Sequence, residues 1–532
     1  MTQKKIVGID LGTTYSAIAH INEDTNKAEI IPSPEQERIT ASVVLFEDES
    51  NILVGEIAKQ NAAAEPTNVV EFVKRQMGKP KEDQKDEEGN AKIQGWCFEN
   101  RDKKYGAQEI SAFILKKLKE DAEKRLGTTI TDAVITCPAY FGDPERFATK
   151  EAGMIAGFNV LAIIDEPVAA ALAYGLDNKG KDQKVFVFDL GGGTLDVVIL
   201  EIQGGKIREI AVNGDHLLGG KDWDDELIKY VADCFKEKYG SNPLDDLISY
   251  QDLQLKAIRA KEELSKREKS KIICAHTGNS LPVELTKIKF EELTAPLVSK
   301  CKMLCEKVLN EAKMSWKDID TVLLVGGSTR MPMIKKMVAE VSGKTPNEDL
   351  NPDECVAFGA AWQGAILGVQ SGDVTGEVAK KLRDVPPVEK VSSHNLGIIA
   401  THKDKGERNY LMIPKFTPLP HEKTNSFGTT YDNQNSALVQ VMEGGIMDDE
   451  ETCDQLDCTK IGEVALDNIP AHPASSPIEV TYKYNVNGML EVRAKDVLSG
   501  REIKSNIEHT GGLSEQEISE AKKETQKISV SG

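Results

Sequence analysis

The sequence lacks any uninterrupted apolar segment of the roughly 20 residues that a bilayer-spanning helix needs. Its first residues, MTQKKIVGID, lack the apolar core and small-residue cleavage site of a secretory signal peptide. Positive charge is also scarce, because 66 Lys and Arg stand against 86 Asp and Glu, for a net charge of −20. That balance argues against broad binding to nucleic acids or anionic membranes, where phosphates dominate affinity. We therefore expect a cytoplasmic protein that binds neither nucleic acid nor membrane.

The nine cysteines form no dense framework of the kind that staples small secreted domains. Cys301 and Cys305 lie in a helical stretch, and Cys453 and Cys458 flank an acidic loop. No histidine completes a zinc-binding spacing. Reduced, structural cysteines are the favoured interpretation, and metal or redox roles are the alternatives.

The chain is long enough for two to four domains, and its pattern changes along its length. Residues 1–370 alternate strand-like and helical runs, which is typical of an α/β domain. Residues 371–391 are rich in Gly, Pro and charge and predict an interdomain linker. Residues 392–512 contain short strand-like runs separated by turn clusters, which predicts a β-sandwich. Residues 513–532 predict a short C-terminal helix.

Four segments give specific local predictions. Residues 107–127 repeat apolar side chains at helical spacing and end in glycine, which predicts an amphipathic helix. Residues 258–272 predict a charged, mostly exposed helix. Asn487 and Gly488, between two alternating runs, predict a type I′ hairpin turn. Ser514 opens a capping box that begins the C-terminal helix.

Two glycine-rich turns far apart in the chain have nearly the same sequence. IDLGTTYS contains Asp10 and FDLGGGTLD contains Asp189, and each turn joins two strand-like runs. Neither is a Walker loop, which opens a helix and carries lysine before Ser or Thr. Glycines let a phosphate approach the backbone amides, and the aspartates could orient a hydrated magnesium ion. The repeat favours a duplicated phosphate site over two unrelated hairpins.

A third glycine turn lies at Gly326, Gly327 and Ser328, after a buried-strand pattern and before a predicted helix. A backbone that passes close to a base or ribose needs glycine. The three turns together predict a nucleotide site with two phosphate turns and one nucleoside turn.

These motifs resemble the ATPase domain of DnaK-type molecular chaperones, the seventy-kilodalton heat-shock family. The segments that carry the resemblance are GIDLGTTYS, VFDLGGGTLDV, ITCPAYFGDPERFATKEAGMIAGFNVLAIIDEPVAAALAYG and LLVGGSTRMPMI. The resemblance covers residues 4–368 well and continues more loosely through the β-rich part. It implies an α/β, actin/hexokinase-like duplicated ATPase domain, in which each half supplies one hairpin to ATP, followed by an all-β sandwich. The implied function is an ATP-dependent chaperone of the stress response that binds unfolded polypeptides and hydrolyses ATP slowly.

The resemblance implies roles for residues that match the family motifs. Lys74 resembles the lysine that positions the attacking water at the γ-phosphate, and Asp196 an aspartate near that water. Glu166 resembles the carboxylate near metal and phosphate, and Thr194 the threonine that contacts the γ-phosphate. Asp189 completes this catalytic set. A cation and magnesium near the γ-phosphate would offset charge in a loose transition state.

The implied cofactor is ATP or ADP with Mg²⁺, and K⁺ is an additional candidate ion. Asp10 and Asp189 match the aspartates around hydrated magnesium. The family usually has a glutamate at the position of Ile258, where it pairs with the ribose hydroxyls. Isoleucine cannot accept those bonds, whose loss typically costs ~1.5–3 kcal/mol, so we expect weaker nucleotide affinity. The implied nucleotide-binding residues are Gly12, Thr13, Thr14, Tyr15, Gly191, Gly192, Gly193, Gly219, Gly220, Lys261, Ser265, Gly326, Gly327, Ser328, Arg330 and Asp353.

The β-rich part resembles the family's peptide-binding sandwich, in which an extended peptide lies in a cleft with one hydrophobic pocket. The implied partners are unfolded or extended polypeptides, with a J-domain co-chaperone and a nucleotide-exchange factor as further candidates. Thr401 and Thr430 occupy the two positions of the arch over the peptide, which would be more polar here. The implied peptide-binding residues are Ile398, Thr401, Phe427, Thr430, Ala437, Val439 and Met489.

Three departures from the family bear on coupling between the domains. The family linker is a run of leucines ending in aspartate, whereas this chain has Pro386, Pro387, Val388, Glu389 and Lys390. The arginine and asparagine that contact J domains correspond to Ala162 and Asp165. The long helical lid is missing beyond about residue 513.

Pro138 and Arg146 match the family's proline switch and its arginine partner. Burying Glu389 and Lys390 without partners would be costly, so docking of this linker is expected to be unfavourable. We therefore expect ATP to change peptide affinity by less than about tenfold, or ~1.4 kcal/mol, and a J-domain protein barely to raise turnover.

Two other functions stay open at this point. A small-molecule kinase of the same superfamily is disfavoured by the separate sandwich and by the lack of a phosphoacceptor pocket that can be named. A nucleotide-bound adaptor or holdase with little hydrolysis is favoured by Ile258 and the altered linker, and disfavoured by Lys74, Glu166 and Thr194.

Overall fold

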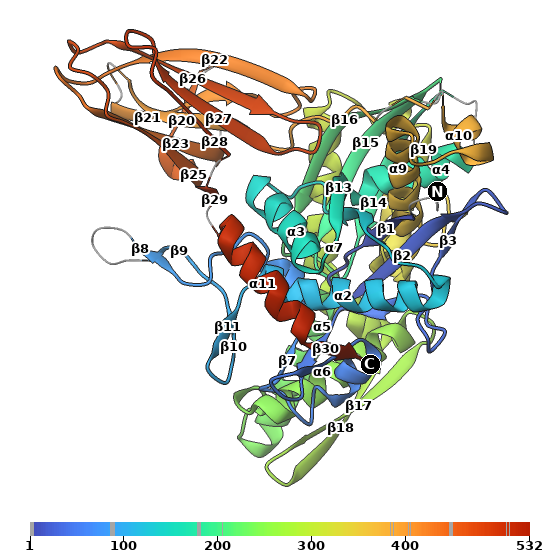
Figure 1. The fold of residues 1–532 in the computed structure, drawn as a ribbon. Helices are drawn as coiled ribbons and strands as arrows, with labels where there is room; N and C mark the ends of the chain where they lie inside the picture. Colours follow the sequence, from blue (N-terminus) through green and yellow to red (C-terminus); the bar gives the residue numbers. More distant parts are fainter. Residues whose placement is uncertain are drawn as a thin grey trace.

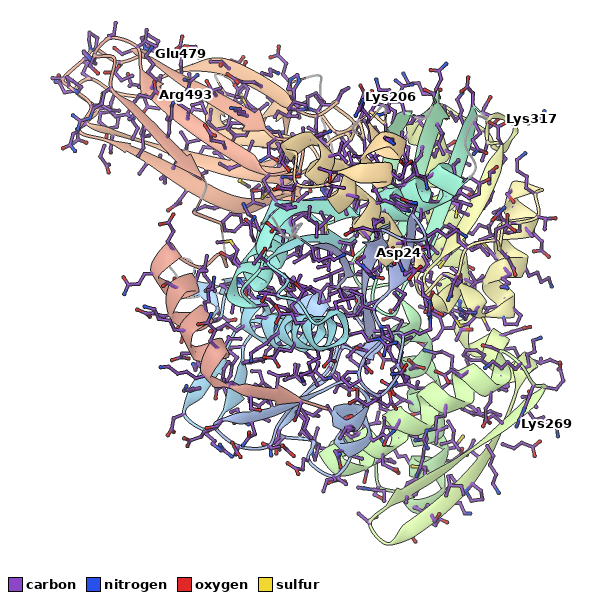
Figure 2. All side chains as sticks on the ribbon, turned by 45° about the vertical axis from the view of Figure 1, so that its right-hand side comes forward. Asp24, Lys206, Lys269, Lys317, Glu479 and Arg493 are labelled. Carbon is purple, nitrogen blue, oxygen red and sulfur yellow. The ribbon has the colours of Figure 1, made fainter. Side chains whose placement is uncertain are left out.

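The computed structural model describes residues 5–85, 91–177, 182–204, 206–383, 385–386, 388–402, 404, 406–445, 451–506, 508–509 and 511–532. The chain forms a larger α/β body and a β-rich part that projects from one edge of it (Figure 1). Charged side chains such as those of Lys206, Lys269 and Lys317 lie on the outside (Figure 2). Within the described residues, no helix combines the length and apolar character needed to cross a membrane.

The first half of the α/β body is built on a sheet with the strand order β13-β12-β1-β2-β3. Strand β1 pairs antiparallel with β2 and parallel with β12. Helices α2 and α3 pack on each other beside this sheet. The bounds are β1 Ile6–Asp10, β2 Tyr15–Asn22, β3 Lys27–Ile30, β12 Asp132–Cys137, β13 Asn159–Asp165, α2 Ala107–Leu126 and α3 Asp143–Ile155.

The second half repeats this plan in the sheet order β16-β15-β14-β19. Strand β14 pairs antiparallel with β15 and parallel with β19, as β1 does with β2 and β12. Helices α4 and α9 pack against each other, and one apolar core cluster joins them to strands of both sheets. The bounds are β14 Gln183–Leu190, β15 Leu195–Gln203, β16 Lys206–Asp215, β19 Thr321–Val325, α4 Glu166–Asp177 and α9 Cys355–Ser371. The matching strand orders confirm the duplicated α/β core.

Smaller elements complete both halves. Three small sheets, β30-β6-β5-β7, β8-β9 and β10-β11, extend the first half, and a helical layer with one hairpin extends the second. The bounds are β4 Thr40–Ala41, β5 Val44–Phe46, β6 Asn51–Val54, α1 Glu56–Asn61, β7 Val69–Val70, η1 Val73–Gln76, β8 Gln84–Lys85, β9 Ala91–Ile93, β10 Phe98–Asn100, β11 Lys103–Tyr105, α5 Gly220–Tyr239, η2 Pro243–Asp245, α6 Leu247–Leu264, β17 Lys269–His276, β18 Asn279–Thr286, α7 Lys287–Glu311, η3 Trp316–Asp318, η4 Gly327–Arg330, α8 Pro332–Ser342 and α10 Gly376–Leu382.

Two of the four local predictions are confirmed. Helix α2 ends at Gly127, which has φ +63°, and Ser514 forms the capping box of α11 with Glu517. The predicted helix over 258–272 is wrong beyond Leu264, because the alternating segment that follows pairs with β18 as strand β17.

The hairpin near Asn487 also differs from its prediction. The strands end at Tyr484 and resume at Leu490, and of the two turn residues only Gly488 has positive φ. The side-chain oxygen of Asn485 accepts from the backbone N–H groups of Asn487 and Met489, which closes a longer loop than a type I′ turn.

The β-rich part is a sandwich of two sheets, with strand orders β24-β21-β20-β23-β25-β29 and β22-β26-β27-β28. Alternate residues of both sheets meet in one apolar core that includes the buried aromatic side chain of Tyr482. The bounds are β20 Leu396–His402, β21 Gly406–Ile413, β22 His421–Gly428, β23 Ser436–Gly444, β24 Thr452–Cys453, η5 Gln455–Asp457, β25 Cys458–Asp467, β26 Pro477–Tyr484, β27 Leu490–Asp496, β28 Glu502–Asn506 and β29 Glu508–His509.

The C-terminal segment lies on the α/β body and not over the sandwich. Helix α11, Glu515–Lys527, packs on α2 and α3, and strand β30, Ser529–Ser531, pairs parallel with β6 (Figure 1). Ile528 and Val530 are buried in the core of the first half. The expected C-terminal helix is present. Strand β30, which follows it, is held on the α/β body because the edge strand β6 offers unpaired backbone groups.

Candidate functional site: a nucleotide site connected to the linker

The two glycine turns face each other across the halves of the α/β body. A Cβ atom added to Gly192 would lie 1.7 Å from Thr14 Oγ1, and one added to Gly193 would lie 2.5 Å from Thr13 Oγ1. Only glycine permits this approach, because any side chain would overlap the opposite turn. The backbone N–H of Gly12 donates to Ser16 Oγ at 3.2 Å and that of Gly191 to the Thr194 carbonyl at 3.0 Å, which holds each turn closed.

The third turn adjoins the second. Ser328 Oγ donates to the carbonyl of Gly191 at 2.8 Å, and a Cβ added to Gly326 would lie 2.4 Å from the carbonyl of Leu190. Gly219 and Gly220, at the start of α5, approach the second and third turns equally closely. Gly220 N donates to the same Gly191 carbonyl at 3.0 Å. The structure thus brings the three predicted turns and the start of α5 together.

The outer positions of the predicted set gather around α6 and α9. Lys261 Nζ donates to the carbonyl of Gly220 at 2.9 Å and pairs with Asp224 at 2.7 Å, and Ser265 Oγ donates to the Lys261 carbonyl. Ile258 lies half-buried one turn before Lys261 on α6. A Cβ added to Gly327 would lie 2.9 Å from Asp353 Oδ1.

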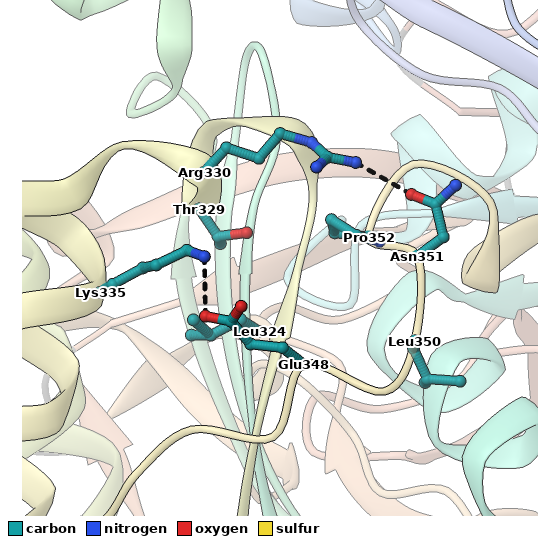
Figure 3. A pocket seen from close by; sticks show the side chains of 8 residues that line it. All are labelled: Leu324, Thr329, Arg330, Lys335, Glu348, Leu350, Asn351 and Pro352. Atoms are coloured by element: carbon teal, nitrogen blue, oxygen red, sulfur yellow. Dashed lines mark hydrogen bonds and ion pairs between the residues drawn. The ribbon is translucent and has the colours of Figure 1, made fainter. Parts of the chain in front are cut away.

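Arg330 borders a pocket beside the third turn (Figure 3). Its guanidinium pairs with Asp353 and donates to Asn351 Oδ1 at 3.0 Å. On the other side of this pocket Lys335 pairs with Glu348 at 2.7 Å. The Arg330 side chain as a whole is 55% exposed.

A buried ion pair lies close to Asp10, the residue that ends β1 and leads into the first glycine turn. Lys74, in the short helical turn η1, pairs with Glu166, the first residue of α4, and both side chains are buried. Burial disfavours the charged form of Lys74, but Glu166 and Asp10 hold its pKa above the usual value. The first half thus keeps a permanent cation close to both turns.

Three aspartates surround this pair. Asp10 ends β1, and Asp189 and Asp196 are register partners on β14 and β15. Burial, followed by the charge of Glu166, raises the pKa of Asp10 to about 7 and that of Asp196 to about 8, and raises that of Asp189 as well.

These aspartates fit a magnesium site. Within the described part of the chain, the buried Oδ2 atoms of Asp189 and Asp196 have no hydrogen-bond partner. No three His, Cys, Asp or Glu side chains of the described residues converge on one point, so a cation here would keep several of its waters. A hydrated Mg²⁺ would offset the negative charge that burial makes costly.

The sequence analysis missed Arg75, the residue after Lys74. Its Nε donates to the carbonyl of Gly193 at 2.9 Å, and its other nitrogens pair with Asp222 on α5. Arg75 thereby ties η1 in the first half to the second phosphate turn. Its position directly after Lys74 was the available signal.

Tyr15 lies on the first hairpin and its hydroxyl accepts from Lys59 at 2.7 Å.

The linker docks on the α/β body, contrary to expectation. Glu389 exchanges backbone hydrogen bonds with Ile207 and Glu209, at 2.9 and 2.8 Å, so the linker adds to the edge of β16. Val385, Val388 and Val391 pack on the core between the two sheets. Pro387 lies outside the described residues.

Lys390 is buried and paired, not unpaired as the sequence analysis assumed. Its Nζ lies 2.7 Å from Asp165 Oδ2, and Arg146 pairs with the other oxygen of the same carboxylate. Burial would raise the pKa of Asp165, but Arg146 and Lys390 hold it below its usual value. Arg146 also donates to the carbonyls of Phe141 and Ala139, on either side of Tyr140.

Asp165, which pairs with Lys390 of the linker, directly precedes Glu166, which pairs with Lys74. One peptide bond therefore separates the linker contact from the Lys74–Glu166 pair. Asp165 and Ala162, which replace the family's J-domain contact residues, are both buried in this arrangement.

Six of the seven predicted peptide-binding positions lie in the sandwich away from the α/β body. Ile398 and Val439 are buried in its core, whereas Thr401 and Thr430 are exposed. Phe427 and Ala437 are partly buried against the same core.

Met489 lies elsewhere, in the loop that contacts the α/β body. The next residue, Leu490, donates its N–H to Asp143 Oδ1 at 2.9 Å. Ile478, in contrast, lies opposite Phe427 across β22 and β26 and is buried in the sandwich core.

The fold and site define a nucleotide-binding protein with a duplicated α/β core, a docked linker and a β-sandwich. The chain belongs to the Hsp70 family, whose model, described as "Hsp70 protein", matches residues 6–531. It is 43% identical over 527 residues to the chaperone protein DnaK of Thermosipho melanesiensis, covering 97% of this chain and 83% of that protein. It is 43% identical over 528 residues to DnaK of Thermotoga neapolitana, with the same coverage. DnaK of Thermosipho africanus is 42% identical over 537 residues, with coverage of 99% and 84%.

Proposed function

We propose that the protein is an ATP-dependent molecular chaperone that hydrolyses ATP slowly while binding unfolded or extended polypeptides. Membership of the Hsp70 family carries the ATPase and chaperone assignment. The observation that best supports hydrolysis is the buried Lys74–Glu166 pair among three aspartates beneath two facing phosphate turns. The proposed location is the cytoplasm, where reduced cysteines such as the nine free ones here are the norm.

The proposed roles follow from the positions of the residues. The two turns hold the phosphates through backbone N–H groups and the hydroxyls of Thr13, Thr14 and Thr194. Asp10 and Asp189 would hold magnesium through water molecules, and the ion would supply charge stabilisation at the phosphates. Lys74 orients the attacking water, and Asp196 and Glu166 would accept hydrogen bonds from the water molecules around the ion. The nucleoside is surrounded by Gly219, Gly220, Lys261, Ser265, Gly327, Ser328, Arg330 and Asp353.

The proposed domain division is residues 1–370 for the ATPase, 371–391 for the linker, 392–512 for the peptide-binding sandwich and 513–532 for the C-terminal segment. The proposed peptide site uses Ile398, Phe427, Val439 and Ile478, with Thr401 and Thr430 at its rim. A J-domain co-chaperone and a nucleotide-exchange factor are proposed partners.

The docked linker favours a chaperone with domain coupling over a holdase without it. Coupling needs contacts that differ between two states, and the Lys390–Asp165 pair would be such a contact because an undocked linker could not make it. The expectation of weak coupling rested in part on an unpaired Lys390, and the pair with Asp165 removes that part of the argument.

The test is ATP turnover by Lys74→Ala in the full chain. We expect turnover to fall at least about 100-fold, as for loss of a group that positions the nucleophile, while ATP still binds. The matched control is Lys117→Ala on helix α2, which removes another buried lysine that pairs with a carboxylate, here that of Asp121. Parental turnover by Lys74→Ala would refute the assigned chemistry, and equal loss in both variants would indicate a folding defect.

A further inference from the structure

Two cysteine side chains meet at one end of the sandwich. Cys453 on β24 and Cys458 at the start of β25 have their Sγ atoms 3.4 Å apart, with the turn η5 between them. A disulfide bond is about 2.05 Å long, so small side-chain rotations would close it. Neither sulfur is bonded in the structure, and all nine cysteines are free.

The surroundings of the two sulfurs are built to hold them together. The side-chain amide of buried Asn409 donates to both sulfurs, at 3.4 Å to Cys453 and 3.2 Å to Cys458. Gly445, with φ +91°, packs directly on the pair, where an added Cβ would lie 2.6 and 2.7 Å from the two sulfurs. Any other residue at 445 would displace one thiol, so this glycine and Asn409 act as a cradle for the pair.

A metal site does not account for this arrangement. Within the described residues, no third His, Cys, Asp or Glu joins the two thiols to complete a coordination sphere. Two thiols in contact without further ligands are the arrangement from which a disulfide forms.

We propose that Cys453 and Cys458 form a redox-active dithiol that closes reversibly to an intramolecular disulfide by exchange with a low-molecular-weight disulfide such as glutathione disulfide. Cys458, which is half-buried, loses its proton and attacks one glutathione sulfur, and the other glutathione leaves as a thiolate. Cys453, which is fully buried, then loses its proton and attacks Cys458 Sγ, expelling the second glutathione. The two protein thiols are oxidised, and one glutathione disulfide is reduced to two glutathione molecules.

The location gives the disulfide a reason to matter. Gly444 donates its N–H to the carbonyl of Asn395 at 2.9 Å, and Asn395 donates its side-chain amide to the Gly445 carbonyl at 3.3 Å. Asn395 also accepts from the backbone N–H of Lys415, whose ammonium pairs with Glu311 of the α/β body at 3.0 Å. The dithiol therefore lies within a few hydrogen bonds of the contact between the sandwich and the ATPase.

The rate of closure has a defined pH dependence. Burial, and then the hydrogen bond with Cys453, raises the pKa of Cys458 to about 12, so the reactive thiolate is scarce at neutral pH. Exchange is therefore slow near pH 7 and accelerates about tenfold per pH unit up to pH 9.

The test uses the full native chain incubated with glutathione disulfide and then alkylated, with intact-mass and peptide-mapping readouts. In the wild type we expect the mass to fall by that of two hydrogens and peptide mapping to show a Cys453–Cys458 disulfide. Dithiothreitol should restore both free thiols. Cys453→Ala should instead trap a glutathione adduct on Cys458, because the resolving thiol is gone. Cys458→Ser should give neither product, and Cys97→Ser, which removes another half-buried thiol, should behave as the wild type.

Two results would overturn the proposal. One is a folded wild-type protein in which Cys453 and Cys458 are both still alkylated after prolonged exposure at pH 8.5. The other is a Cys453–Cys458 link that forms only in denaturant. Because neither readout depends on ATP or peptide, the proposal stands or falls independently of the proposed function.

Discussion

Replacing Lys390 by methionine tests whether the linker controls the docked state. The substitution keeps most of the side-chain volume and removes the charge that faces Asp165. The contact is an ion pair, and depriving a buried polar group such as Asp165 of a partner typically costs ~1–3 kcal/mol. Loss of a buried pair can cost ~3–5 kcal/mol, but Asp165 keeps its pair with Arg146, so the lower range applies. The ratio of docked to undocked linker should therefore fall about 10- to 100-fold.

Amide exchange of the linker in saturating Mg-ATP measures this ratio. The Glu389 N–H, which donates to the Ile207 carbonyl in the docked linker, should exchange about 10- to 100-fold faster in Lys390→Met. Peptide affinity measured with ATP should then approach the value measured with ADP, because fewer molecules are docked. A wild-type difference above about tenfold between the two nucleotides is expected, since coupling of 1–3 kcal/mol is typical.

The matched control is Lys206→Ala at the same linker. Lys206 pairs with Glu389, but the two side chains are 45% and 43% exposed, and such pairs contribute at most about 1 kcal/mol. Linker exchange should therefore change no more than about fivefold. The reasoning is refuted if Lys390→Met exchanges like the wild type, or if Lys206→Ala has an equal effect.

Three further predictions concern other contacts. First, burial, and then the charge of Glu145, raises the pKa of Glu443 at the sandwich–ATPase contact from its usual 4.5 to about 8, so docking of the two parts takes up a proton. Docking should therefore be strongest at low pH and weaken as the pH rises from 4.5 through 8. Glu443→Gln should flatten this dependence in an interdomain fluorescence-transfer assay, and a pH profile identical to that of the wild type would count against the prediction. Second, Ile478→Ala should weaken binding of a leucine-rich reporter peptide at least about tenfold in fluorescence anisotropy, because ~2–5 kcal/mol of packing is lost. The control Val480→Ala, at a buried position on the same strand, should lower stability only, and equal losses of peptide affinity in both variants would contradict the proposed peptide site. Third, Val530→Asp should release β30 from β6 and speed amide exchange of 528–531, because an unpaired charge would be buried; Ser529→Asp, at an exposed position, should not, and slow exchange in both would show that β30 is held by other contacts.

Features set by local chemistry were predictable from the sequence. The facing glycine turns could be recognised because the Asp-Leu-Gly turn with nearby threonines occurs twice in similar surroundings. The helix that ends at Gly127 and the capping box at Ser514 follow from rules that act within one or two turns of helix.

Features set by long-range pairing were not predictable. The charged segment after Leu264 has the composition of a helix, but its alternating pattern also suits a strand, and it pairs with β18 as strand β17. Only the tertiary partner decides between helix and strand. In the same way, register across β22 and β26 determines that Ile478 lies opposite Phe427, and the sequence alone does not give that register. Arg75 is a lone arginine until the second half of the molecule brings the Gly193 carbonyl to it.

The linker shows why a departure from a family pattern is poor evidence for a lost function. Glu389 and Lys390 looked unable to dock, because the cost of burying a charge was considered without its partner. The partner was itself one of the departures: Asp165 stands where the family was expected to have asparagine, and it lies opposite Lys390. Glu389 keeps its side chain at the surface, where it pairs with Lys206, while its backbone extends β16. Two changes that each suggest lost coupling therefore combine into one buried ion pair, next to Glu166, by which linker docking can act on the nucleotide site.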